Sequence, residues 1–232
     1  MFIFDDLLVS LSEKINREEA KRLPLLLNAE VKEMKNQFIF PADKAFELGV
    51  KPYCGTSISL LTDKDIDDEI ILLGDDLDEM KEYKNYARIV IGSIDPSKMG
   101  EKNAFYNSIR KFDYVKYHFS YPEVMNRVSS FNNLESLLVS KKGVKEKINF
   151  SKLGSYFISK YKELPFVNNV KMIFVTIDDF PYGDLSIAQS KIENITKALD
   201  HLMNNVKMDC RSCSLQVICS EVEKKVEKDF KK

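Results

Sequence analysis

Hydrophobic positions along the chain follow two spacings, one typical of amphipathic helices and one typical of strands. Near the N-terminus, apolar residues recur every three or four positions, which predicts a helix over residues 5–22 that ends before Pro24. Residues 24–50 mix short apolar pieces with charges, so we expect a connecting arm with some strand there. The residues that carry the helical period are Leu7, Leu8, Leu11 and Ile15.

Three short runs rich in β-branched and other apolar residues come next, over residues 56–63, 69–76 and 87–95. Each run ends near Asp, Gly or Pro, which favour turns, and each is therefore predicted to be a strand. The acidic segment DKDIDDE between the first two runs lacks the Gly and the terminal Glu of a calcium loop. We expect it to form a solvated hairpin turn.

Helical and strand patterns alternate in the second half of the chain. The predicted helices cover residues 105–119, 153–164, 192–206 and 222–230. The predicted strands cover residues 134–140 and 170–178, with a basic turn at residues 141–147 and a loop at residues 180–184.

This order of elements predicts an α+β protein. We expect a mixed β-sheet covered by helices, an N-terminal helix, and a C-terminal helical segment that carries cysteines. The expected division is an N-terminal helix and arm (residues 1–40), an α+β domain (residues 41–180), and a C-terminal part (residues 181–232). The last part holds the long helix, the cysteine segment and the final helix.

Charge and composition narrow the class of protein. The chain has 232 residues, 44% of them hydrophobic, which is enough for one sizeable core. Its 35 Lys and Arg residues almost cancel its 36 Asp and Glu residues, so the balance gives no reason to expect nucleic acid or a membrane as partner. The N-terminus lacks a basic leader, and no apolar run approaches the ~20 residues of a membrane span. We therefore expect a soluble, cytoplasmic protein.

The common catalytic signatures are absent from the sequence. It has no GxGxxG, no GxxxxGK[ST] and no G-x-S-x-G. Only His118 and His201 are available for a nucleophilic triad, and its other members would have to come from distant segments. Whether the protein is an enzyme is left open by these observations.

The most specific chemical signal is the spacing C-x2-C-x5-C formed by Cys210, Cys213 and Cys219. In a reducing compartment, clustered cysteines indicate metal ligands more often than disulfides. Thiolates are soft donors that favour an iron–sulfur cluster or zinc, and the start of the final helix would favour their negative charge. Cys54 is the one remaining thiol and a candidate fourth ligand. Buried thiols without a metal, and a redox dithiol at Cys210 and Cys213, are the alternatives.

Several segments, in their order along the chain, look like a known family. The stretch FELG at residues 46–49 and the turn GDDLD at residues 74–78 resemble the middle domain of the acetyl-CoA synthase β subunit of the carbon monoxide dehydrogenase/acetyl-CoA synthase complex. Residues 87–99 and 152–178 resemble the strand, and the helix with its following strand, that come later in that family. The resemblance covers roughly residues 38–219.

The resemblance implies a [4Fe-4S] cluster on Cys210, Cys213 and Cys219. This chain has no counterpart of the fourth cluster cysteine or of the Cys-Gly-Cys nickel motif, so it is not a complete acetyl-CoA synthase on its own. The family links its middle domain to coenzyme A through arginines and a tryptophan. No Trp is present here, and Arg110 and Arg127 are the nearest candidates.

Three functions remain after these observations. The first is an iron–sulfur accessory or binding module in one-carbon, corrinoid or CO/acetyl-CoA metabolism, with a corrinoid protein or another subunit of such a complex as partner. The second is a structural interaction domain stapled by zinc on the same ligands. The third is one subunit of a split acyltransferase.

Overall fold

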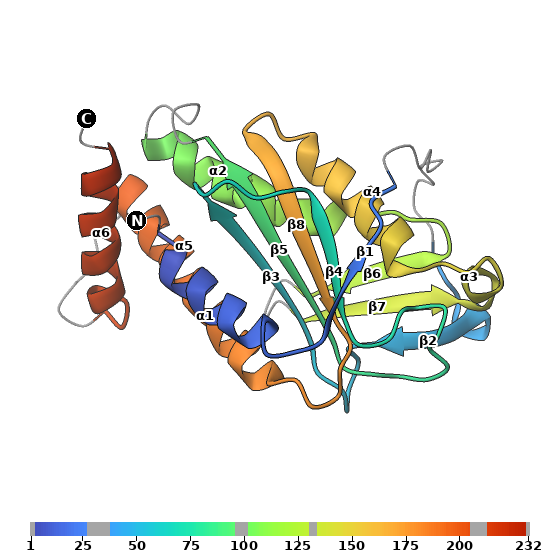
Figure 1. Ribbon diagram of the computed structural model, residues 1–232. Helices are drawn as coiled ribbons and strands as arrows, with labels where there is room; N and C mark the ends of the chain where they lie inside the picture. Colours follow the sequence, from blue (N-terminus) through green and yellow to red (C-terminus); the bar gives the residue numbers. More distant parts are fainter. Residues whose placement is uncertain (1–2, 27–37, 96–101, 130–133, 205–212, 231–232) are drawn as a thin grey trace.

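The α+β prediction is confirmed by the computed structural model, which contains helices together with two β-sheets (Figure 1). The structure describes residues 3–26, 38–95, 102–129, 134–204 and 213–230. None of the helices in these ranges combines the length and the hydropathy that a bilayer-spanning segment requires.

A five-stranded mixed sheet forms the centre of the molecule, in the order β1-β4-β8-β5-β3. Strand β1 pairs with β4 antiparallel, β4 with β8 parallel, β8 with β5 antiparallel, and β5 with β3 parallel. The central strand β8 connects two parallel pairs that run in opposite directions. The bounds are Ala20–Leu23 for β1, Gly55–Thr62 for β3, Glu69–Leu73 for β4, Tyr86–Ile94 for β5 and Val167–Val175 for β8.

The core runs along β5, β8 and β3. Every residue of β5 is buried, as are most residues of β3 and the second half of β8. Strands covered on both faces read as continuous apolar runs rather than alternating ones, which explains why these runs are recognisable in the sequence.

A second, three-stranded antiparallel sheet lies at one end of the first, in the order β2-β7-β6 (Figure 1). Its strands are β2 (Lys44–Leu48), β7 (Glu135–Ser140) and β6 (Val124–Val128). A 3-10 turn at Pro41–Asp43 precedes β2, and β7 contacts both β3 and β5 of the first sheet. The two sheets therefore share one hydrophobic core.

Helices α2 (Lys102–Tyr114) and α4 (Phe150–Lys162) lie behind the central sheet in the view of Figure 1. A 3-10 turn at Val115–His118 continues α2 toward β6. Asn149 caps α4, because its side-chain oxygen accepts a hydrogen bond from the Lys152 N–H at 2.9 Å.

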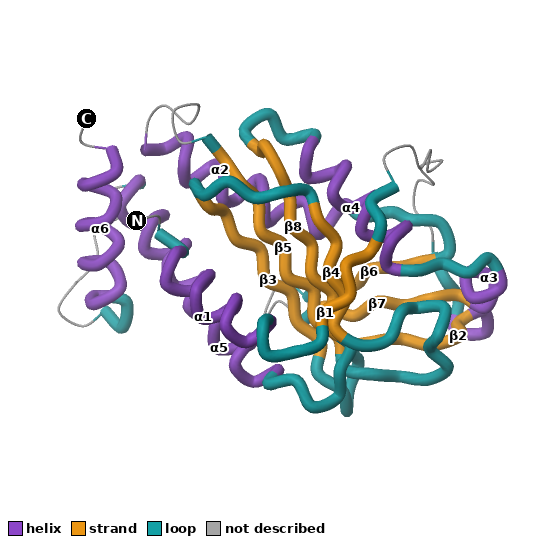
Figure 2. Tube along the Cα trace, viewed as in Figure 1, coloured by secondary structure: helices purple, strands orange, loops and turns teal. Residues whose placement is uncertain are grey.

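Three further helices lie on the β3 side of the sheet (Figure 2). They are α1 (Asp5–Ile15), α5 (Tyr182–Met203) and α6 (Gln216–Phe230). Helix α5 packs against β3, α2 and α6, so it links the sheet to the C-terminal helix. The short helix α3 (Lys141–Lys145) follows β7 at the opposite end.

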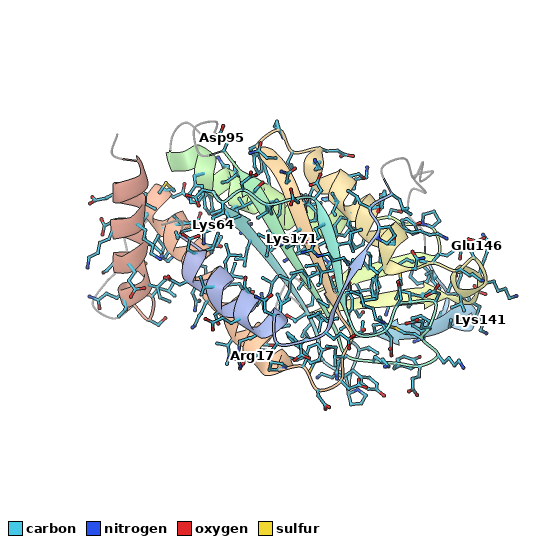
Figure 3. The ribbon with its side chains drawn as sticks, in the orientation of Figure 1. Arg17, Lys64, Asp95, Lys141, Glu146 and Lys171 are labelled. Carbon is cyan, nitrogen blue, oxygen red and sulfur yellow. The ribbon has the colours of Figure 1, made fainter. Side chains whose placement is uncertain are left out.

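Charged side chains of both signs are distributed over the whole length of the molecule (Figure 3). Lys64 and Asp95 lie toward the α2 end, whereas Lys141 and Glu146 lie at the α3 end. Lys171 on β8 pairs with Glu69 on β4 at 3.0 Å. This spread agrees with the near-zero net charge.

Several sequence predictions differ from the structure in their bounds. The first helix ends at Ile15 rather than near residue 22, and Ala20–Leu23 is an edge strand. The basic turn at residues 141–147 begins with helix α3, whose N-terminus is capped by the Ser140 hydroxyl. Helix α5 begins at Tyr182, ten residues before the predicted start. The expected hairpin at DKDIDDE is wrong, because β3 and β4 are separated by β8 and β5.

Candidate functional site

Two of the predicted metal ligands, Cys213 and Cys219, lie at the start of α6. Cys210 falls outside the described residues. Cys213 is partly buried in the turn before the helix, where its carbonyl oxygen accepts a hydrogen bond from the Gln216 N–H at 3.2 Å. Cys219 lies in the first turns of α6, partly buried and packed against the hydrophobic core. Two of the three predicted thiol donors thus flank one helix start.

Helix α6 is held in place by apolar and ionic contacts. Val222 and Val226 are buried in the core, as their helical spacing predicts. The Lys225 ammonium donates to the Asp6 carboxylate of α1 at 3.0 Å. These contacts fix the helix that carries Cys219.

Cys54 lies elsewhere in the fold. It is exposed in the turn before β3, where its N–H donates to the Asn85 side-chain oxygen at 2.8 Å. Burial raises the pKa of Tyr182, at the start of α5, and the nearby Asp178 and Cys54 act in the same direction. The beginning of β3 lies away from α6 in Figure 1.

Within the described ranges, no group of three or more His, Cys, Asp or Glu side chains is arranged to hold a metal ion. Because Cys210 is outside those ranges, this finding does not test the predicted site, which stays a prediction.

Arg110 lines a pocket of about 370 Å³ between α2 and α5, beside the edge strand β3. Each helix contributes a polar stripe at helical spacing, and β3 contributes Ser57 and Ser59. The pocket falls within the 300–1,000 Å³ range of small-molecule sites. Its polar lining residues are Tyr106, Arg110, Asp113, Tyr114, Lys116 and Tyr117 around α2, and Gln189, Glu193, Thr196, Lys197 and Asp200 on α5.

Arg127 does not join Arg110 in this pocket. It lies on β6 in the second sheet, where its guanidinium contacts the Glu47 carboxylate at 3.2 Å. Glu47 is buried on β2 and also accepts a hydrogen bond from the Ser136 hydroxyl at 2.9 Å. The contacts of Arg127 therefore fit a role in pairing the strands of the second sheet. The two arginines suggested by the resemblance belong to different parts of the fold.

A buried ion pair behind the pocket was missed by the sequence analysis. The Arg88 guanidinium on β5 donates to both oxygens of Glu135 on β7, each at 2.6 Å, and to the Tyr161 hydroxyl at 3.2 Å. Arg88 and Glu135 are 0% exposed. The guanidinium also lies over the Phe119 and Phe157 rings, at 5.2 and 5.8 Å from their centroids.

Burial acts to lower the pKa of Arg88, but the Glu135 carboxylate outweighs it and holds that pKa above its usual value. Burial also raises the pKa of Tyr161, while the Arg88 charge opposes it. Arg88 therefore stays protonated over the physiological pH range. The one signal in the sequence was an arginine within an otherwise apolar strand run, ARIVIGSID.

The residues that carry the family resemblance have structural roles. Phe46 and Leu48 are buried on β2, and Gly49 after them has a positive φ of 73°. The Asp76 carboxylate accepts a hydrogen bond at 2.7 Å from the Phe150 N–H at the start of α4. Burial raises the pKa of Asp76, and the backbone N–H groups only partly oppose it. Both motifs therefore shape the fold and do not line the pocket.

No protein-family model matches the chain, and no curated protein matches it either.

Proposed function

We propose that the protein is a cytoplasmic metal-binding accessory module that holds a [4Fe-4S] cluster on Cys210, Cys213 and Cys219, related to the acetyl-CoA synthase β subunit but without its nickel site. The observation that carries this proposal is the position of Cys213 and Cys219. Both are partly buried beside the start of α6, which packs on the core through Val222 and Val226.

The donor set fits a soft metal centre. Three thiols within ten residues suit iron–sulfur or zinc chemistry and not magnesium or calcium. The N–H groups at the start of α6 favour the negative charge that thiolates bring. An iron–sulfur cluster would supply one-electron transfer. The fourth ligand would be external, since Cys54 lies in the turn before β3.

A role in a larger assembly follows from this chemistry. The module would transfer electrons, assist methyl-group handling with a corrinoid protein, or dock through its cluster onto another subunit of a CO dehydrogenase/acetyl-CoA synthase-like complex. A subunit of a split acyltransferase is a variant of this proposal in which the nickel half is a separate chain.

Zinc is the second candidate for the metal. Helices α5 and α6 pack against each other, and the cysteine segment joins them. A tetrahedral ion on the same thiols would staple this pair of helices and make the C-terminal part a structural interaction element.

Anaerobically purified protein is expected to be brown and to contain about four iron atoms per chain. Cys213→Ser should remove most of the iron and the visible absorbance, because it deletes one of the three thiolates. Elemental analysis and the absorbance spectrum of both proteins check this expectation. Cys54→Ser is the matched control and should keep the metal content of the parent.

If the purified protein contains stoichiometric zinc and no iron, and Cys213→Ser loses that zinc, the bound metal is zinc and the iron–sulfur proposal is wrong. A colourless anaerobic sample without either metal would contradict the whole proposal. Equal loss of iron in Cys54→Ser and Cys213→Ser would show that the fourth ligand is assigned wrongly.

A further inference from the structure

The pocket between α2 and α5 is lined by three cationic and three acidic side chains, which differ in the partners they have. Each of its three carboxylates has a donor nearby. Asp113 accepts from the Lys116 ammonium at 2.8 Å, Glu193 from the Gln189 side-chain nitrogen at 2.9 Å, and Asp200 from the Asn204 side-chain nitrogen at 2.7 Å. Each carboxylate of the pocket thus has at least one hydrogen-bond donor within the protein.

The cationic side differs. Lys116 is buried and paired with Asp113, but Arg110 and Lys197 make no hydrogen bond or ion pair within the described ranges. Both side chains line the pocket from facing helices, Arg110 from α2 and Lys197 from α5. These two cations are therefore available to pair with an anionic group of a ligand.

The strand beneath the pocket adds a second, independent observation. Ser57 on β3 lines the pocket and is 2% exposed, and within the described part of the chain its hydroxyl has no hydrogen-bond partner. A buried polar group without a partner costs free energy, so such a group in a pocket indicates a ligand that supplies the missing hydrogen bond.

Aromatic rings form the rim. Tyr114 and Tyr117 line the pocket with their ring centroids 5.8 Å apart, and both rings are more than one-third exposed. Exposed tyrosines beside a cavity favour a flat ligand that shields their faces from water.

We propose that this pocket is a binding site for a small aromatic anion that also carries a hydrogen-bonding group. Its anionic group lies between Arg110 and Lys197, its ring lies against the two rim tyrosines, and its polar substituent meets the Ser57 hydroxyl. The site is separate from the cysteine segment, and its assignment does not depend on the proposed metal function.

The test measures binding of four probes to the full-length chain by isothermal titration calorimetry and ligand-observed NMR. 4-Hydroxybenzoate combines all three features. Phenyl phosphate shows whether a phosphate replaces the carboxylate. Inorganic phosphate lacks the ring, and 4-hydroxybenzyl alcohol lacks the charge. We expect 4-hydroxybenzoate or phenyl phosphate to bind more tightly than the other two probes, and binding to weaken as salt is raised.

The matched pair of variants is Arg110→Gln and Arg127→Gln. Each removes one positive charge from an arginine side chain, but only Arg110 lines the pocket. Arg110→Gln should weaken binding of the anionic aromatic probe about tenfold or more, because a charge-assisted contact is lost. Arg127→Gln should leave it unchanged. Ser57→Ala should weaken the binding of 4-hydroxybenzoate. The binding of phenyl phosphate, which has no second polar group, should stay unchanged.

Three results would overturn the proposal. They are failure of both anionic aromatic probes to bind, equal affinities in the two arginine variants, and binding of inorganic phosphate as tight as that of phenyl phosphate. Circular dichroism spectra and unfolding midpoints that match the parent show that the variants are folded.

Discussion

Arg88→Met is expected to lower the free energy of unfolding by about 3–5 kcal/mol. The substitution leaves the Glu135 carboxylate, which is 0% exposed, without the two hydrogen bonds that it accepts from Arg88. It also removes a donor from Tyr161. Because a typical domain is stable by only 5–15 kcal/mol in total, urea unfolding should show a large fall in midpoint, or the variant should fail to fold.

Two variants separate this effect from the loss of an ordinary ion pair. Arg22→Met removes an ion pair with Glu69 whose arginine side chain is 84% exposed, and it should cost less than about 1 kcal/mol. The double variant Arg88→Met with Glu135→Leu should recover part of the loss, because no charge is left buried alone. Equal unfolding midpoints for Arg88→Met and Arg22→Met would contradict the argument.

Gly55→Ala is expected to destabilise the fold by about 3 kcal/mol or more. A Cβ at this position would lie 2.2 Å from the Glu135 carbonyl oxygen and 2.3 Å from the Gly49 carbonyl oxygen. Both neighbours are backbone atoms, so neither can rotate away, and β3 would have to separate from β7. Urea or thermal unfolding of the variant measures the effect.

Gly183→Ala is the matched control for this substitution. No atom lies within 4 Å of a Cβ built at Gly183, which is in the first turn of α5. The same added methyl group should therefore be neutral or stabilise by about 0.4–1 kcal/mol. A similar loss of stability in both variants would show that the contact at Gly55 is not the cause.

Both large effects converge on Glu135. Its side chain joins β7 to β5 through Arg88, and its backbone carbonyl lies against the start of β3 and the end of β2. Glu135 thus links the two sheets at one point. On the paired strands β3 and β5, Ser57 and Arg88 are in register and project from one face of the sheet, so this junction also supports the pocket.

Local pattern determined much of the fold in advance. The helix expected at residues 153–164 corresponds to Phe150–Lys162, and the strand expected at residues 170–178 to Val167–Val175. Both elements bury most of their apolar residues against the same core, so their periodicity is strong. The cysteine spacing, and the metal site that it predicts, likewise come from the sequence alone.

Weakly buried strands were not predicted. Strand β1 is mostly exposed and β6 is only partly buried, so neither has the clear alternation that a half-buried strand shows. The order of the strands in the sheet could not be predicted from local sequence pattern either. Strand β8 inserts between β4 and β5, although it lies 73 residues or more after both in the chain.

The same contrast between local pattern and tertiary packing applies to the candidate sites. Amino-acid type and spacing along the chain determined the α+β class, the main helices and buried strands, and the spacing of the cysteines, because these depend on neighbours within a few turns. Tertiary structure alone decided that Arg88 meets Glu135, that Arg110 lines a pocket while Arg127 pairs with Glu47, and that Cys54 lies in the turn before β3. These contacts join residues that are far apart in the chain, and only the packing of the two sheets and their helices brings such residues together.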